Sequence, residues 1–285
     1  MKKILILVFI FMFSVSSGEC KKLEYFVEPE KIRANPGEKI NFKVIFKNFK
    51  KIENIAINPP DVIWVLEKKE TIDQKDRKEI NYSLNIPSDV SPNVYKIESK
   101  AKINGKENKK YLTISIPYKC SKAQNPPVIS EASCSPCYWG YKRSARFENV
   151  IFYSLYDEKN LYIAVQVKDE DVSSDDNIDL YLFVKNKMHI FSFSPKGEYK
   201  GETKVNWVKK IFGTIDNSKD TDNSYWIVFS IPLNLLKITP QEKEIIKINV
   251  VNIDNKSGFK SWSNLINSQN FLKNPELFVD FIFED

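Results

Sequence analysis

The side chains best suited to chemistry are the carboxylates that crowd one short segment, residues 169–176. Several carboxylate oxygens on one loop are the ligands that Ca²⁺, a hard cation, prefers. We therefore interpret this loop as a candidate calcium site, with a solvated acidic loop as the alternative. The carboxylates concerned belong to Asp169, Glu170, Asp171, Asp175 and Asp176.

Four cysteines form the second reactive set: Cys20, Cys120, Cys134 and Cys137. An even number of cysteines in an oxidising compartment is typical of disulfides. The pairing cannot be derived from the sequence, and Cys20 with Cys120 and Cys134 with Cys137 is one of three arrangements. The spacing of residues 134–137 also matches a redox motif, but no strand–turn–helix pattern surrounds it. We expect structural disulfides, with a redox or metal role as the alternative.

The remaining composition argues against enzyme chemistry and against nucleic acid. His189 is the only histidine, which excludes zinc sites built on several histidines. The sequence has no Gly-x-Ser-x-Gly motif and no glycine-rich phosphate loop. The 43 basic and 37 acidic residues, a net charge of +6, are interspersed along the chain, whereas a nucleic-acid footprint clusters basic residues. We therefore expect a non-catalytic protein that does not bind nucleic acid.

Residues 1–19 have the pattern of a secretory signal. Lys2 and Lys3 precede an apolar run over residues 4–13, and small residues follow. This run is shorter than the about 20 residues that a membrane-spanning helix needs. Glu19 argues against lipid attachment at Cys20, because a small residue would precede an acylated cysteine. We expect a secreted, periplasmic or cell-surface protein with no membrane span after signal removal.

The acidic loop ends a predicted β-hairpin over residues 155–169. Leu161, Ile163 and Val165 alternate with polar or small residues, which is the period of a strand with one face in a core. Residues 157–160 supply the turn. A hairpin that ends in an acidic loop presents polar groups on a scaffold, as a binding module does.

Comparable short strands fill the chain and predict an all-β fold of two β-sandwich domains. The first covers residues 23–118, and Asn104-Gly105 within it is a strong hairpin signal. A polar linker is expected over residues 119–127, and the second domain over residues 128–285. The only helical candidate is a short turn at Pro232, which tolerates a first helical position.

The first unit resembles the bacterial immunoglobulin-like modules called NEW3. The resemblance covers about 95 residues, and its motifs serve structure. It implies a spacer or docking module. The matching pieces are residues 35–37, 40–46, Asn48, Trp64, 86–90 and Tyr95.

The second unit resembles carbohydrate-binding module family 9, in its broad sense of related extracellular sandwiches. Four separate pieces match in order, and an ordered combination is more specific than any single motif. The resemblance implies a non-catalytic module that binds a glycan. The pieces are residues 127–129 with Trp139, residues 155–169, residues 176–183, and a final section made of residues 248–252, 261–263 and 275–278.

The family's sugar site, as this resemblance implies, sandwiches a terminal sugar between two tryptophans while a carboxylate and an arginine bind its hydroxyls. Asp179 falls at the carboxylate position and Phe271 at the second aromatic position. The first tryptophan has no counterpart, and Ser192 occupies the arginine position. Trp207 lies in a polar run and is our candidate for the missing aromatic platform. The alternatives are a solvated strand residue for Asp179 and packing roles for Phe271 and Trp207.

Two other functions compete with glycan binding. Related sandwiches in exported oxidoreductase subunits hold haem, and Met188 and His189 are the only methionine and histidine after the signal. Neighbours on a strand point to opposite faces, so a lysine would have to serve as the second iron ligand. The third possibility is a purely structural surface protein that contacts other cell-envelope proteins.

Overall fold

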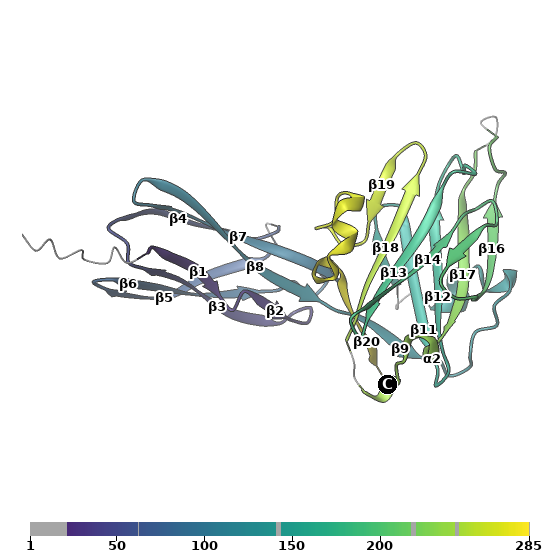
Figure 1. Ribbon diagram of the computed structural model, residues 1–285, viewed down its shortest axis with the longest axis horizontal. Helices are drawn as coiled ribbons and strands as arrows, with labels where there is room; N and C mark the ends of the chain where they lie inside the picture. The colour runs from purple at the N-terminus through teal and green to yellow at the C-terminus, as the bar shows by residue number, and fades with distance from the viewer. Residues whose placement is uncertain (1–21, 62, 141–143, 218–220, 243–244, 285) are drawn as a thin grey trace, which may run out of the picture.

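The computed structural model describes residues 22–61, 63–140, 144–217, 221–242 and 245–284, and they form two β domains side by side (Figure 1). This confirms the all-β prediction. The residues of the predicted signal, 1–19, lie outside the described part of the chain. Among the described residues, no helix is long and apolar enough to cross a membrane.

The first domain is a sandwich of two four-stranded sheets, with strand orders β1-β3-β6-β5 and β2-β8-β7-β4. Alternate residues of each sheet point inward and close a common core around Val44, Leu84 and Ile114. The Asn104-Gly105 turn joins β7 to β8, and both residues have positive φ values of 50° and 79°, as this type of tight hairpin turn requires. The strands are β1 Glu24–Glu28, β2 Lys31–Arg33, β3 Lys39–Lys47, β4 Ile52–Asn58, β5 Val65–Gln74, β6 Arg77–Asn85, β7 Asn93–Ile103 and β8 Lys106–Ile116.

The second domain is one twelve-stranded sheet that curls over a single core. Its main path runs β15-β14-β13-β18-β20-β9-β11-β12-β17-β16, with β10 paired to β11 and β19 to β18. Phe193 and Phe229 come from near opposite ends of this path, yet their ring centroids are 4.4 Å apart. The sheet therefore folds back on itself into two facing layers. The strands are β9 Tyr118–Lys122, β10 Ser144–Phe147, β11 Val150–Tyr156, β12 Asn160–Lys168, β13 Asn177–Val184, β14 Lys187–Phe193, β15 Tyr199–Gly201, β16 Asn206–Phe212, β17 Ser224–Pro232, β18 Ile246–Asp254, β19 Gly258–Ser261 and β20 Val279–Glu284.

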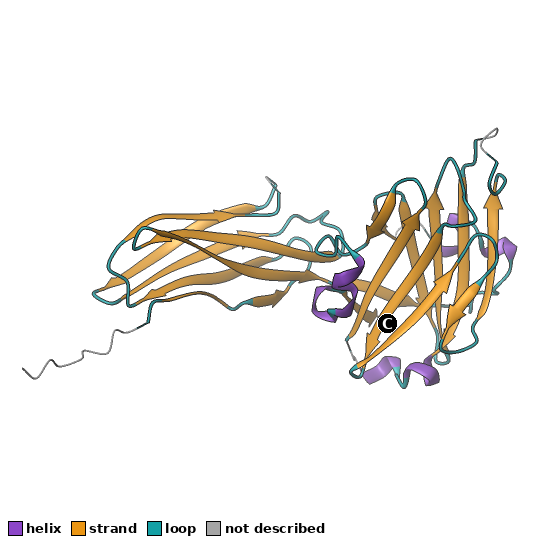
Figure 2. Ribbon diagram, turned by 45° about the horizontal axis from the view of Figure 1, so that its top comes forward, coloured by secondary structure: helices purple, strands orange, loops and turns teal. Residues whose placement is uncertain are grey.

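Short helical segments cover parts of the outer sheet faces (Figure 2). One pair packs Trp139 and Cys134 against β11, β12 and β17, and another packs Leu272 and Phe278 against β13 and β18. As a result, β12 is buried on both faces rather than on the one face that its alternation predicted. The segments are η1 Glu131–Ser133, α1 Pro136–Trp139, α2 Leu233–Leu236, η3 Pro240–Glu242, η4 Gln269–Lys273 and η5 Pro275–Leu277.

The linker predicted over residues 119–127 is wrong in its first part. Residues Tyr118–Lys122 form β9, which pairs in parallel with both β11 and β20. Tyr118 and Cys120 point into the core while Lys119 is exposed. The segment looked polar in the sequence because only its inward positions are apolar. The chain thus passes from the last strand of the first domain almost directly into the sheet of the second.

Candidate functional site

The candidate sugar site lies on the outer face of β13. Leu180 of this strand points into the core of the curled sheet, so the alternate residues Asn177, Asp179 and Tyr181 share the opposite face. The strand register places Ser192 of β14 beside Asp179, and Lys200 of β15 beside Ser192. The fold therefore lines up a carboxylate, a hydroxyl and an ammonium group across three neighbouring strands.

Asp179 is a nearly buried carboxylate that its neighbours hold in place. Its side chain accepts hydrogen bonds from Asn177 Nδ2 and, at 3.3 Å, from the hydroxyl of Tyr181. Burial raises the pKa of Asp179 above the usual aspartate value, although hydrogen bonds from Ser192, Tyr181 and Asn177 oppose this rise. The positive charge of Lys200 also favours the ionised carboxylate. Asp179 is thus a positioned acceptor rather than a freely solvated one.

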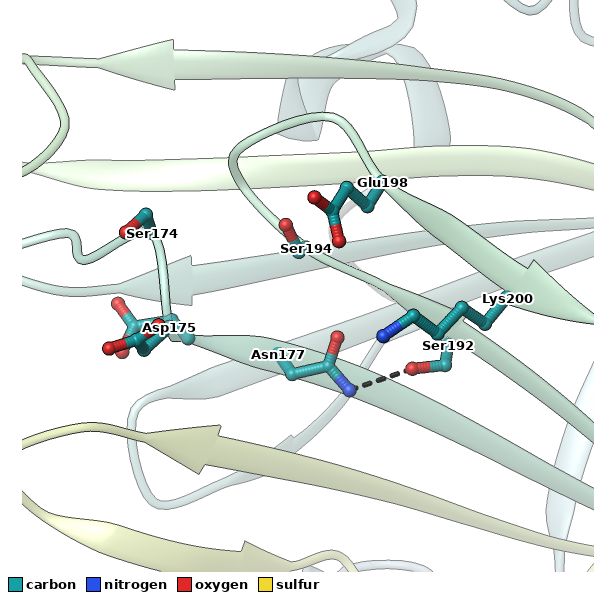
Figure 3. A pocket seen from close by; sticks show the side chains of 8 residues that line it. Ser174, Asp175, Asn177, Ser192, Ser194, Glu198 and Lys200 are labelled. Carbon is teal, nitrogen blue, oxygen red and sulfur yellow. Dashed lines mark hydrogen bonds between the residues drawn. The ribbon is translucent and has the colours of Figure 1, made fainter.

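A polar hollow of about 230 Å³ opens at Asn177, the residue whose side chain donates to Asp179 (Figure 3). Asn177 Nδ2 donates to Ser192 Oγ at 2.8 Å across its floor. The hollow therefore presents several hydrogen-bond donors and acceptors close to one another on the outer face of the sheet. It is lined by Ser174, Asp175, Asp176, Asn177, Ser192, Ser194, Glu198 and Lys200.

Phe271 lies over the same outer face. It belongs to η4, and the residue is 45% exposed. Its neighbour Leu272 is buried in a cluster with Tyr181, the residue whose hydroxyl donates to Asp179. The structure therefore brings the predicted aromatic residue and the predicted carboxylate to one face of the sheet.

Trp207 does not belong to this face. It packs against the inner core of the curled sheet, with ring-centroid distances of 5.4 Å to Phe193 and 6.4 Å to Tyr199. Phe193 and Ser192 are consecutive on β14 and so point to opposite sides of the sheet. Trp207 therefore cannot face Phe271 across a sugar bound at Asp179, and our prediction of a replacement platform is wrong.

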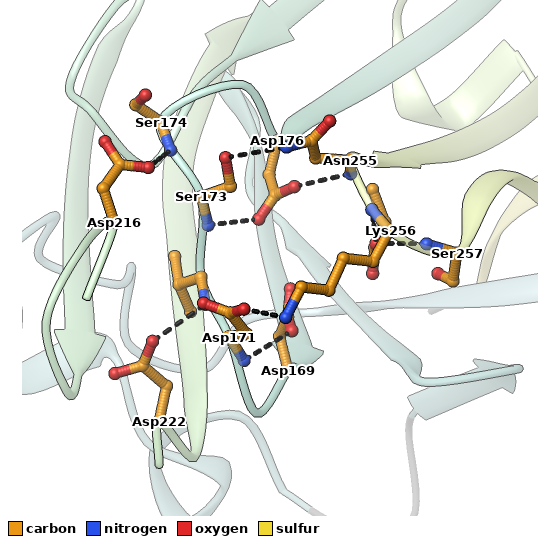
Figure 4. A network of polar contacts seen from close by, with 12 residues as sticks. Asp169, Asp171, Ser173, Ser174, Asp176, Asp216, Asp222, Asn255, Lys256 and Ser257 are labelled. Carbon is orange, nitrogen blue, oxygen red and sulfur yellow. Dashed lines mark hydrogen bonds and ion pairs between the residues drawn. The ribbon is translucent and has the colours of Figure 1, made fainter. Parts of the chain in front are cut away.

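The acidic loop uses its carboxylates to cap backbone N–H groups (Figure 4). Asp176 accepts from the backbone nitrogens of Ser173 at 2.7 Å and Asn255 at 2.9 Å. Asp169 accepts from the backbone nitrogen of Asp171, whose own carboxylate pairs with Lys256.

Asp169, Asp171 and Asp176 therefore already have hydrogen-bond or ion-pair partners within the protein. Within the described ranges, no group of three or more histidine, cysteine, aspartate or glutamate residues could hold a metal ion. The structure therefore gives no support to the calcium site predicted from Asp169, Asp171, Asp175 and Asp176.

The buried, acidic surroundings of Asp176 raise the pKa of its carboxyl group. Burial, helped by the nearby carboxylates of Asp169 and Asp254, raises the pKa of Asp176 to about 6, although two backbone hydrogen bonds oppose this rise. Asp176 is only 2% exposed. The loop thus holds a carboxyl group that titrates close to neutral pH.

The described cysteines form no disulfide with one another. Cys134 is buried against Trp139 and Trp226, whereas Cys137 is exposed. The structure therefore does not show the pairing of Cys134 with Cys137. Cys20 lies outside the described residues, and its pairing with Cys120 stays a prediction.

Met188 and His189 lie on opposite faces of β14, as the strand period predicted. Met188 packs on the outer cluster that contains Tyr181, while His189 is 8% exposed and lies across from Leu182 of the core face. One iron cannot be held by both side chains. The structure offers no support for a haem site at this pair.

The sequence analysis did not identify two residues of the candidate site, Asn177 and Lys200. Asn177 could have been found, because it stands two positions before Asp179 on an alternating strand. Lys200 could not, since its place beside Ser192 depends on the register between β14 and β15. Lys200 brings a cation from the neighbouring strand to the place where the resemblance implies an arginine.

No family model and no curated protein matches this sequence. Among solved structures, a carbohydrate-binding module family 9 from Caldicellulosiruptor kristjanssonii in complex with glucose is similar to 58% of this chain, over 95% of its own length, with 15% identity and a TM-score of 0.43. The BIgI domain of beta protein from S. agalactiae, bound to CEACAM1, is similar to 33% of this chain, over 96% of its own length, with 22% identity and a TM-score of 0.26. Because both scores are below 0.5, neither likeness identifies the function of this chain.

Proposed function

We propose that this chain is an exported, non-catalytic protein of the cell surface whose second domain binds a glycan at the hollow that opens at Asn177. The observation that carries the proposal is the cluster of Asp179, Asn177, Ser192 and Lys200 on the outer face of three neighbouring strands. A sugar hydroxyl both donates and accepts hydrogen bonds. A carboxylate accepts them, an ammonium group donates them, and an amide and a hydroxyl do both, so the cluster can pair with sugar hydroxyls in either sense.

Phe271 supports the same proposal. A half-exposed aromatic ring near a polar cluster can cover the apolar C–H face of a sugar while the polar groups bind its hydroxyls. The hollow, at about 230 Å³, is smaller than the pockets that hold drug-sized ligands. We therefore expect a single sugar ring, such as the end of a glycan, to enter it.

The expected affinity is weak. Phe271 is the single exposed aromatic residue that we assign to the site, so we expect a Kd of about 10 μM or weaker, which corresponds to about −7 kcal/mol. Titration calorimetry of the full chain against cello-, xylo- and galacto-oligosaccharides measures it. No heat with any of these sugars would refute the proposal.

Two variants locate the site. Phe271→Ala should remove most of the measurable binding, because it deletes the aromatic contact. Asp179→Asn should weaken binding by roughly 1.5–3 kcal/mol, the range of a hydrogen bond to a charged group. Phe212→Ala is the matched control, since Phe212 is 42% exposed but lies on β16. Unchanged affinity in both site variants would place the sugar elsewhere.

A further inference from the structure

The segment that carries Phe271 is held at both ends by the first domain. We call residues 262–280 the strap; it runs from the end of β19 to the start of β20 and includes η4 and η5. Its middle lies on the outer sheet face, where Phe278 packs at a centroid distance of 6.2 Å from Tyr181. Its two ends contact the first domain.

Asn93 and Pro92 form the first anchor. The Asn93 side chain donates to the carbonyl oxygen of Trp262 at 2.9 Å and accepts from the backbone nitrogen of Asn264 at 3.2 Å. The indole nitrogen of Trp262 donates to the carbonyl oxygen of Pro92 at 2.9 Å. Asn93 is 5% exposed and Trp262 is 1% exposed. The first domain thus satisfies these polar groups of the second domain, and the side chains that take part, those of Asn93 and Trp262, are themselves almost fully buried.

Arg33 forms the second anchor, at the other end of the strap. Its Nε lies 2.8 Å from Oδ2 of Asp280, whose side chain is 2% exposed and also pairs with Lys247 at 2.6 Å. Lys31 pairs nearby with Glu276, but both of those side chains are exposed, and exposed pairs contribute little. The buried Asp280 is therefore the contact that fixes this end.

We infer that the first domain is a working part of the sugar site: Asn93 and Arg33 are positioning residues that hold the strap, and with it Phe271, against the sheet face that carries Asp179. This role in binding rests on the function proposed above. The anchoring itself does not, because it follows from the contacts between the two domains. The first domain is then more than a spacer, because it positions a segment of the second.

Hydrogen exchange on the full-length chain tests the anchoring without any sugar. In Asn93→Ala and in Arg33→Ala, the amides of residues 264–278 should exchange about tenfold faster, the factor expected when buried hydrogen bonds that restrain a segment are lost. The amides of β11 and β12 should stay protected from hydrogen exchange, and this result would show that the second domain is still folded. Each variant should also weaken binding of whichever oligosaccharide the wild type binds.

Matched controls separate anchoring from a general loss of stability. Asn41→Ala removes an exposed asparagine of β3 in the same domain. Arg77→Ala removes an arginine whose side chain is 43% exposed, against 44% for Arg33. Equal strap exchange in the anchor variants and their controls would overturn the inference.

The sugar measurements separate this inference from the proposed function. Faster strap exchange with unchanged sugar affinity would remove the strap from the binding mechanism. A wild type that binds no sugar would refute the proposed function, while the exchange data would still decide whether the first domain holds the strap.

Discussion

The carboxyl group of Asp176 should make the stability of this protein depend on pH in an unusual direction. Burial raises its pKa from 3.8 to about 6 in the folded chain, so folding favours the neutral form. Stability from this group is fully present below about pH 4 and is lost as the pH rises through about 6. Each pH unit between the two values is worth about 1.4 kcal/mol, so the loss amounts to about 3 kcal/mol.

Other carboxylates act in the opposite direction, which determines how the assay must be designed. Hydrogen bonds from Lys247 and Arg33 lower the pKa of Asp280 in spite of its burial, so its contribution grows as the pH rises through the acid range. The quantity to measure is therefore the difference in unfolding free energy between the wild type and Asp176→Asn, from urea denaturation between pH 4 and pH 8. The asparagine variant does not titrate at this position.

The wild type should lose about 3 kcal/mol relative to Asp176→Asn between pH 4 and pH 7. Asp175→Asn serves as the control, because it removes an exposed carboxylate from the same loop. A difference curve that stays flat across this range, or that rises with pH, would refute the assignment of a raised pKa to Asp176.

Three further predictions concern packing, a turn and a thiol. Trp207→Ala should lower the free energy of unfolding by roughly 2–4 kcal/mol through lost packing, yet leave sugar affinity unchanged in calorimetry; a loss of affinity without a loss of stability would return Trp207 to the site. Gly105→Ala should cost about 1 kcal/mol in urea denaturation because Gly105 has a φ of 79°, and a neutral result would mean that the hairpin turn relaxes. Burial raises the pKa of the Cys134 thiol to about 11, so mass spectrometry after iodoacetamide treatment at pH 8 should find Cys134 alkylated only when urea is present; fast labelling of the folded chain would contradict this burial.

The sequence predicted those parts of the fold that depend on neighbouring residues. The alternation in residues 161–168 defined β12, and the Asn104-Gly105 pair defined the turn between β7 and β8. In both cases the information lies within a few residues, because strand period and turn conformation are local properties. The same locality placed Met188 and His189 on opposite faces of a strand.

Other predictions found no support in the structure because a residue's surroundings come from distant parts of the chain. Trp207 stands in a polar stretch of sequence, but the curled sheet brings Phe193 and Tyr199 against its ring. The aspartates of residues 169–176 looked like metal ligands, but Asn255 and Lys256 from a distant hairpin use two of their carboxylates.

Local sequence patterns were enough to predict an all-β chain and its turns at residues 104–105 and 157–160, and the family resemblance singled out Asp179 and Phe271. The tertiary structure alone decided that these two residues share a sheet face, that Lys200 lies beside Ser192, and that Asn93 of the first domain holds the strap. The physical reason is that strand period is set by the local backbone, whereas strand register and domain contacts depend on pairings between residues far apart in the chain. Asn93 and Trp262, for example, are 169 positions apart in the chain and are brought together by the contact between the domains.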